Sequence, residues 1–134
     1  MRYVFFVALL TSLMILSGCK SDPPKIAFTD IDMSVADAGS GEKLFHQSNN
    51  DAPICATCHG DNGNSGIGPS LKDIVDKAGN RVSGQSAEEY MYWSIISPSR
   101  YLVVGYSNVM YSKYEDVFGA EDIADLIAYL LTLQ

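Results

Sequence analysis

The sequence reads Cys55-Ala56-Thr57-Cys58-His59 near its middle, and this stretch decides how the rest of the chain is interpreted. The order C-x-x-C-H is typical of covalent haem attachment. Two cysteines three positions apart can form thioethers with the two vinyl groups on one porphyrin edge, and the adjacent imidazole can turn under the ring to ligate iron. The motif therefore predicts one haem c, bound through Cys55 and Cys58, with His59 as an axial ligand.

Three other uses of this motif compete with haem. A thioredoxin-like redox site also contains C-x-x-C, but it requires an α/β fold, and strand signals are weak here. A structural zinc site requires four ligands, and His46 is the only further candidate near the motif unless carboxylates contribute. A disulfide between Cys55 and Cys58 would leave the neighbouring His59 unexplained.

Hydrophobic periodicity predicts an all-α fold, with three to four helices and long loops around one haem. Ser40 is a candidate N-cap, and Ser86 with Glu89 forms a capping-box pattern. The helices are expected at 40–48, 86–96 and 121–133, with one or two helical turns at 71–77. Loops are expected at 60–70, 80–84 and 97–118, with 101–104 as a β-like run.

The N-terminal residues have the features of an export signal. Arg2 precedes an apolar stretch, and Leu16-Ser17-Gly18-Cys19 follows the pattern of a bacterial lipobox, in which the cysteine is lipidated. We expect residues 1–18 to be a lipoprotein signal peptide, 19–37 a lipid anchor and flexible tether, and 38–134 the folded domain. An ordinary signal peptide that ends near a cysteine, or an uncleaved anchor, is the alternative.

The charge balance narrows the choice of partners. The chain has 9 Lys and Arg against 16 Asp and Glu, and cleavage before Cys19 would remove Arg2 and change the formal net charge from −7 to −8. Such a surface disfavours nucleic acid and anionic lipid and favours partners with basic patches. A lipid on Cys19 would therefore hold the protein at a membrane, because acyl chains bury methylene groups.

From about Gly39 to Leu133 the chain resembles a class I cytochrome c. It is especially similar to the cytochrome c domain fused to subunit II of some haem-copper oxidases. Besides the haem motif, the matching segments are Gly41-Glu42-Lys43-Leu44-Phe45, Gly66-Ile67-Gly68-Pro69-Ser70-Leu71, Glu89-Tyr90-Met91, Ser94-Ile95-Ile96 with Pro98, Val104-Gly105-Tyr106, Asn108-Val109-Met110 and Ile123-Ala124-Asp125-Leu126-Ile127-Ala128-Tyr129-Leu130.

A haem that only transfers electrons usually has a second axial ligand, and the candidates are Met33, Met91, Met110 and His46. The resemblance implies Met110, in the long loop before the last helix. It also implies that the Pro69 carbonyl accepts a hydrogen bond from His59. One departure concerns Tyr111-Ser112-Lys113-Tyr114, which stands where related oxidase domains carry a stiffening proline soon after the methionine.

The same resemblance implies that the first and last helices cross, with Gly41 allowing a close approach near Tyr129. The candidates to line an apolar haem pocket are Leu44, Phe45, Leu71, Tyr92, Trp93, Ile95, Tyr106 and Ile127. The tyrosines between 90 and 114 are read as packing residues that cover the haem, in preference to a chain of redox sites.

These features predict a membrane-anchored monohaem electron carrier and not an enzyme, with no small-molecule substrate. Its expected place is outside the cytoplasm, on the outer face of a bacterial membrane. Its expected partners are respiratory or photosynthetic redox proteins, such as a quinol-oxidising complex and a terminal oxidase. The alternatives are a cytochrome subunit held permanently in a larger oxidoreductase, or a five-coordinate haem sensor or small peroxidase without Met110 on iron.

Overall fold

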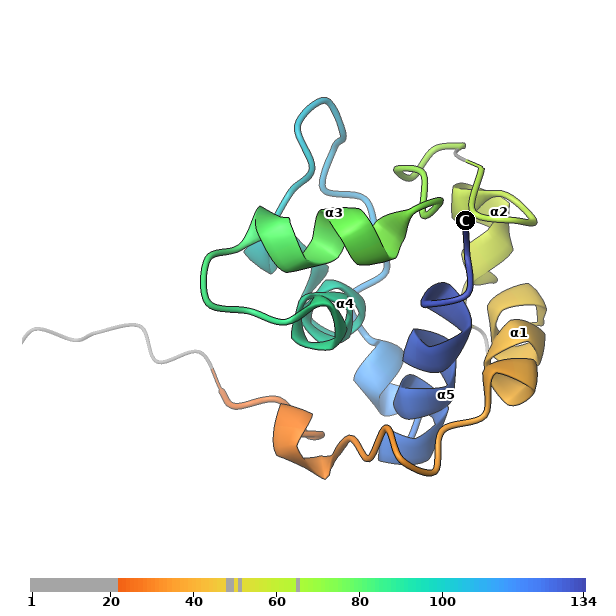
Figure 1. Ribbon diagram of the computed structural model, residues 1–134, viewed down its shortest axis with the longest axis vertical. Helices are drawn as coiled ribbons and strands as arrows, with labels where there is room; N and C mark the ends of the chain where they lie inside the picture. The colour runs from red at the N-terminus through yellow and green to blue at the C-terminus, as the bar shows by residue number, and fades with distance from the viewer. Residues whose placement is uncertain (1–21, 48–49, 51, 65) are drawn as a thin grey trace, which may run out of the picture.

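The computed structural model describes residues 22–47, 50, 52–64 and 66–134, and every regular element among them is helical (Figure 1). The α-helices are α1 (Ala38–His46), α2 (Cys55–His59), α3 (Ile74–Arg81), α4 (Ala87–Ile96) and α5 (Ala120–Leu130). Three single 3-10 turns accompany them: η1 (Phe28–Asp30), η2 (Pro98–Arg100) and η3 (Tyr114–Asp116). The predicted all-α fold is confirmed, and the β-like run at 101–104 forms no strand.

The first and last helices cross at a glycine. A Cβ atom at Gly41 would lie 1.9 Å from the Asp125 carbonyl oxygen and 2.9 Å from Tyr129 Cβ, so only glycine fits here. Figure 1 shows α1 and α5 side by side as a result. The close approach expected at Gly41 is thus present, and it brings Phe45 of α1 and Leu126 of α5 into one core.

Helix α1 begins earlier than expected. Its N-cap is Asp37, whose carboxylate accepts a hydrogen bond from the Gly39 amide at 2.9 Å. Ser40, the predicted cap, lies inside the first turn, and its hydroxyl donates to the other oxygen of Asp37 at 3.0 Å. Asp and Ser are both good caps, so the sequence alone did not separate the two positions.

Helix α3 occupies residues that were expected to be partly loop. It begins at Ile74 instead of 71 and continues through Gly79 and Asn80 to Arg81. Its buried residues, Ile74 and Ala78, face α4, and this packing overrides the weak helix propensity of glycine and asparagine.

Helix α4 matches its prediction closely. The Ser86 hydroxyl accepts a hydrogen bond from the Glu89 amide at 3.1 Å, and the helix ends two residues before Pro98. The Glu89 carboxylate accepts from Trp93 Nε1 at 3.2 Å. Helix α5 ends at Leu130, three residues before the predicted boundary, and Leu133 remains buried beyond it.

The segment before α1 differs from the expected flexible tether. Its apolar side chains at Ile26, Phe28, Ile31 and Met33 are partly buried against the core. We call residues 25–33 the N-terminal strap; in Figure 1 it is the orange segment that runs along the lower edge of the domain. The apolar side chains of the strap are irregularly spaced and gave no periodic signal in the sequence, because they pack against residues that are distant in the sequence.

Within the described residues, none of the helices has the length and apolar character needed to span a bilayer. The expected signal peptide at 1–18 and the expected lipidation site at Cys19 lie outside the described residues.

Candidate cofactor site

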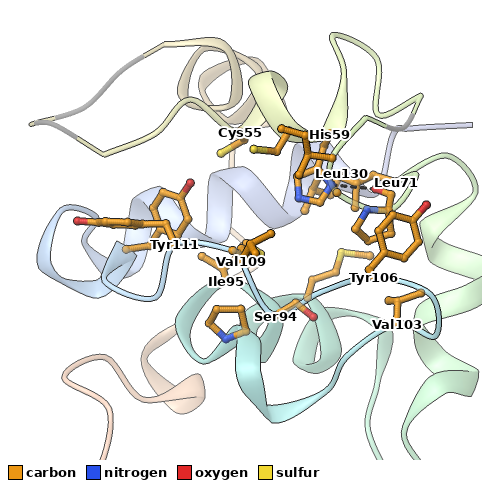
Figure 2. Close-up of a pocket in the computed structure, with 18 of the residues that line it drawn as sticks. Cys55, His59, Leu71, Ser94, Ile95, Val103, Tyr106, Val109, Tyr111 and Leu130 are labelled. Carbon is orange, nitrogen blue, oxygen red and sulfur yellow. Dashed lines mark hydrogen bonds between the residues drawn. The ribbon is translucent and has the colours of Figure 1, made fainter.

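An apolar cavity of about 300 Å³ lies between α2, α4, α5 and the segment that joins α4 to α5. This volume is at the lower end of the range for cofactor and ligand pockets. Figure 2 shows Cys55 and His59 on one side of the cavity, with Ser94 and Ile95 of α4 facing them from the other.

The predicted attachment motif forms a helix of its own. Cys55, Cys58 and His59 occupy α2, where positions i, i+3 and i+4 share one face, and all three line the cavity. Cys55 and Cys58 form no disulfide, and burial raises the pKa of the Cys55 thiol to about 11. Helix α2 therefore presents two sulfurs and one imidazole together to an apolar space.

His59 is held by the loop that follows α2. Its Nδ1–H donates to the Pro69 carbonyl at 2.8 Å, which is the contact expected from the family resemblance. The ring is 8 % exposed, and desolvation lowers its pKa below the usual value. Because Nδ1 carries the proton in this hydrogen bond, Nε2 is left with a free lone pair that can bind a metal.

Glycines let this loop wrap closely around α2. A Cβ atom at Gly68 would lie 2.7 Å from His59 Cε1, and one at Gly66 would lie 2.7 Å from the Cys58 carbonyl oxygen. The Gly68 amide donates to that same carbonyl at 2.9 Å. The glycine-rich stretch expected to be irregular thus serves to hold the imidazole ring from the side.

The candidate second ligands occupy different places. Met110 is half-buried and lines the cavity; its neighbour Val109 lies across the cavity from His59 in Figure 2. Met91 also lines the cavity, but it is buried to 2 % exposure within α4. Met33 belongs to the strap and packs against the core without being part of the cavity lining.

His46 is engaged elsewhere. Its Nδ1 lies 2.8 Å from the Glu42 carbonyl oxygen, and its Nε2 lies 2.7 Å from the Asp61 carbonyl oxygen. Carbonyl oxygens only accept, so both contacts are satisfied at once only by the doubly protonated ring. The Glu42 contact and, more weakly, the Asp61 contact accordingly raise the pKa of His46. Both ring nitrogens therefore face carbonyls and not the cavity.

Only half of the expected apolar lining is correct. Phe45, Leu71, Ile95 and Tyr106 line the cavity, whereas Leu44, Tyr92, Trp93 and Ile127 do not. On α4 the rotation of the helix is the reason: the side that carries Met91, Ser94 and Ile95 faces the cavity, while Tyr92 faces the strap and Trp93 lies under Arg100. Helix α4 is apolar on nearly all sides, so its sequence gave no rotational preference.

Arg81 was missed by sequence reasoning, whereas Tyr90 was expected among the tyrosines that pack on the haem. Arg81 is the one permanently charged residue among the described residues that line the cavity. Its Nη1 donates to the Tyr90 hydroxyl at 2.8 Å, and its guanidinium lies 5.4 Å from the centroid of the Tyr90 ring. An arginine at the end of a short helix carries no sequence signal of this role, because the role depends on how α3 packs on α4.

The part of the chain that the structure describes contains no cluster of side chains that would support the zinc alternative. There, no group of three or more His, Cys, Asp or Glu side chains has an arrangement that could hold a metal ion by itself. The residues present fit a haem instead: two thiols and an imidazole face one apolar cavity, two methionines line it, and one arginine stands at its wall.

The comparison with protein families agrees with this geometry. The family model described as Cytochrome c matches residues 38–134, which is most of the chain. The chain belongs to the cytochrome c family. This cytochrome accordingly has covalently attached haem c and the all-α fold of that family, and it is a haem-based electron carrier. Neither the curated proteins nor the solved structures gave a match to it.

Proposed function

We propose that this cytochrome is a lipid-anchored monohaem protein that transfers single electrons between redox proteins at the outer face of a bacterial membrane. The observation that carries the proposal is the shared cavity, which brings Cys55, Cys58, His59 and Met110 together from two distant parts of the chain. The resemblance to the cytochrome domain of haem-copper oxidase subunit II supports a place in a respiratory or photosynthetic chain.

The residues of α2 hold the cofactor in this proposal. Cys55 and Cys58 form the two thioethers, and His59 ligates the iron through Nε2. The iron supplies the one-electron chemistry by alternating between the ferrous and ferric states. Pro69 keeps the imidazole in one orientation through the hydrogen bond at 2.8 Å, which also makes the ring a better donor to the metal.

Met110 is the proposed second axial ligand. It lies on an irregular segment that can present its sulfur to the cavity, whereas Met91 is packed inside a helix. A neutral thioether favours the ferrous state and raises the reduction potential. The apolar lining acts in the same direction, because burial penalises the additional positive charge of ferric iron.

Arg81 is the proposed partner of the haem carboxylates. Arginine binds carboxylates through a planar fork of N–H donors, and Arg81 already lines the cavity with its side chain held by Tyr90. Its positive charge also opposes the ferric state, so it supports a raised potential.

The proposed docking face is the rim of the cavity. Ile67, Leu102 and Val109 line the cavity and are exposed, and Val104, in the same segment as Leu102 and Val109, is 94 % exposed. A small apolar patch suits brief contact with a partner, and the net negative charge of the whole chain favours partners with basic surroundings. A quinol-oxidising complex as donor and a terminal oxidase as acceptor fit these requirements.

The proposal is tested by absorption spectra of the purified full-length protein in both oxidation states, together with cell fractionation of a Cys19→Ala variant. We expect a six-coordinate spectrum in both states and loss of membrane retention in the variant. A high-spin five-coordinate spectrum would favour a sensor or small peroxidase. Recovery only as part of a large complex would favour the permanent-subunit alternative.

A further inference from the structure

The N-terminal strap lies outside the stretch that matches the cytochrome c family, which begins at residue 38. It nevertheless contacts two elements that border the cavity, α4 and η3. Helix α4, against which η2 packs, lies before the segment that carries Met110, and η3 lies after it. The contacts of the strap with each of them suggest a role in holding that segment.

At one end the strap binds η3. The Lys25 backbone amide donates to Glu115 Oε2 at 2.9 Å, and Lys25 Nζ forms an ion pair with Asp116. The same turn carries Tyr114, whose hydroxyl donates to the Pro53 carbonyl at 3.0 Å, two residues before the first haem cysteine. The strap therefore holds a turn that also contacts the region of the haem motif.

The next residues of the strap, Ile26 and Phe28, bind the back of α4. The Tyr92 hydroxyl donates to the Ile26 carbonyl at 2.5 Å, and the Phe28 and Tyr92 rings lie 5.4 Å apart. Tyr92 is fully buried. Burial raises the pKa of its hydroxyl, and so, to a smaller extent, does the carboxylate of Glu115.

Residues 101–113, between η2 and η3, have little internal support. They form no helix or strand, and three of their apolar side chains, those of Leu102, Val104 and Val109, are exposed. Gly105 has a φ of 92°, and the segment contains no proline. The position of Met110 thus depends strongly on where the two ends of this segment are held.

We propose that the N-terminal strap is a positioning element for Met110. By joining α4 to η3, it fixes the two ends of residues 101–113 relative to each other and so keeps the Met110 sulfur on the iron. It supplies the restraint that a proline after the methionine would otherwise provide. This inference rests on the proposed ligation by Met110.

The test uses the full-length haem protein with the double substitution Phe28→Ala and Glu115→Ala, which weakens the contacts of the strap with α4 and with η3. The far-red absorption band of ferric iron with methionine ligation is followed as the pH rises. We expect unchanged haem content and an equilibrium for methionine displacement that is about tenfold more favourable, because the variant loses one aromatic contact and one hydrogen bond of ordinary strength. The band should then disappear about one pH unit lower than in the wild type, since a tenfold change in that equilibrium corresponds to one unit.

Two matched controls separate this effect from a general loss of surface contacts. Lys77→Ala removes an exposed ion pair with Asp73 on α3, at 3.9 Å, and Val35→Ala changes an exposed residue between the strap and α1. Both should keep the wild-type pH profile. Far-UV circular dichroism reports whether each variant is folded, and Glu115→Gln provides a milder change if the double variant is not.

A Met110→Ala variant distinguishes the two proposals. If it retains the far-red band, ligation by Met110 is wrong, and the role of the strap falls with it. If Met110→Ala loses the band while the double variant, or Glu115→Gln in its place, titrates as the wild type does, Met110 is the ligand and the strap does not position it.

Discussion

Gly41→Ala should destabilise the protein at the crossing of α1 and α5. The added Cβ would lie 1.9 Å from the Asp125 carbonyl oxygen, whereas ordinary contacts begin near 3.4 Å, so the helices must separate by roughly 1.5 Å. Overpacking of this kind costs about 3 kcal/mol when the clashing atom is backbone, and alanine recovers about 1 kcal/mol through helix propensity. The expected net loss of unfolding free energy is therefore about 2 kcal/mol.

Gly79→Ala is the matched control, because it makes the same chemical change in α3. The nearest atom to a Cβ there is the Ala87 nitrogen at 4.0 Å, so the side chain fits. It should stabilise the protein by about 1 kcal/mol through helix propensity alone.

Urea unfolding of the haem-loaded protein, followed by circular dichroism, measures both variants. With a slope of about 2 kcal/mol per molar urea, Gly41→Ala should lower the unfolding midpoint by about 1 M, and Gly79→Ala should raise it slightly. The cavity should also loosen in Gly41→Ala, since Phe45 of α1 and Leu126 and Leu130 of α5 line it. Equal midpoints for the two variants would refute the reasoning, because the only difference between them is the close helix crossing.

Three further predictions concern the site and its surroundings. Arg81→Gln should lower the reduction potential measured by spectroelectrochemical titration, because a cation near the haem disfavours the ferric state, and Arg81→Lys should restore part of the shift; a potential unchanged in both would place the arginine away from the cofactor. Gly68→Ala should displace the His59 ring, lengthen its 2.8 Å hydrogen bond to Pro69 and shift the Soret band, whereas a wild-type spectrum would show that the loop yields easily. His46→Gln should remove a pH-dependent part of the stability: the folded pKa of His46 is raised, so its contribution is full below the unfolded value of 6.5 and is lost as the pH rises through the folded pKa. Urea midpoints of wild type and His46→Gln should therefore differ most in acid and converge above neutral pH, and a constant difference would contradict this.

Local signals predicted those parts of the structure that depend on neighbouring residues. The cap at Ser86 and the stop before Pro98 were found because capping and proline chemistry act within one turn. The use of Cys55, Cys58 and His59 by one cofactor was predicted from their spacing, although the helix over these residues was not. These features needed no knowledge of tertiary packing.

Features that depend on tertiary packing could not be predicted from the sequence. Helix α3 continues through Gly79 and Asn80 because Ala78 is buried against α4, a contact with no local signature. The rotation of α4, which points Tyr92 toward the strap, could not be read from a helix that is apolar on nearly all sides. The place of Arg81 in the cavity lining could not be predicted either, because it depends on how α3 packs on α4.

The strap illustrates the same limit most clearly. Its apolar residues follow neither a helical nor a strand period, so they read as scattered positions in a linker. The strap is held in place by contacts with residues about sixty to ninety positions away, such as those of Ile26 with Tyr92 and of Lys25 with Glu115. Composition therefore predicted a flexible linker, whereas long-range contacts hold this segment against the core.

Mass spectrometry of the unfolded, acid-extracted protein tests the central claim most directly, since only a covalently held porphyrin survives that treatment. The expected result is a polypeptide heavier by one haem, with the added mass on the peptide that contains Cys55 and Cys58. A polypeptide at its unmodified mass, with both cysteines alkylated as free thiols, would contradict the assignment.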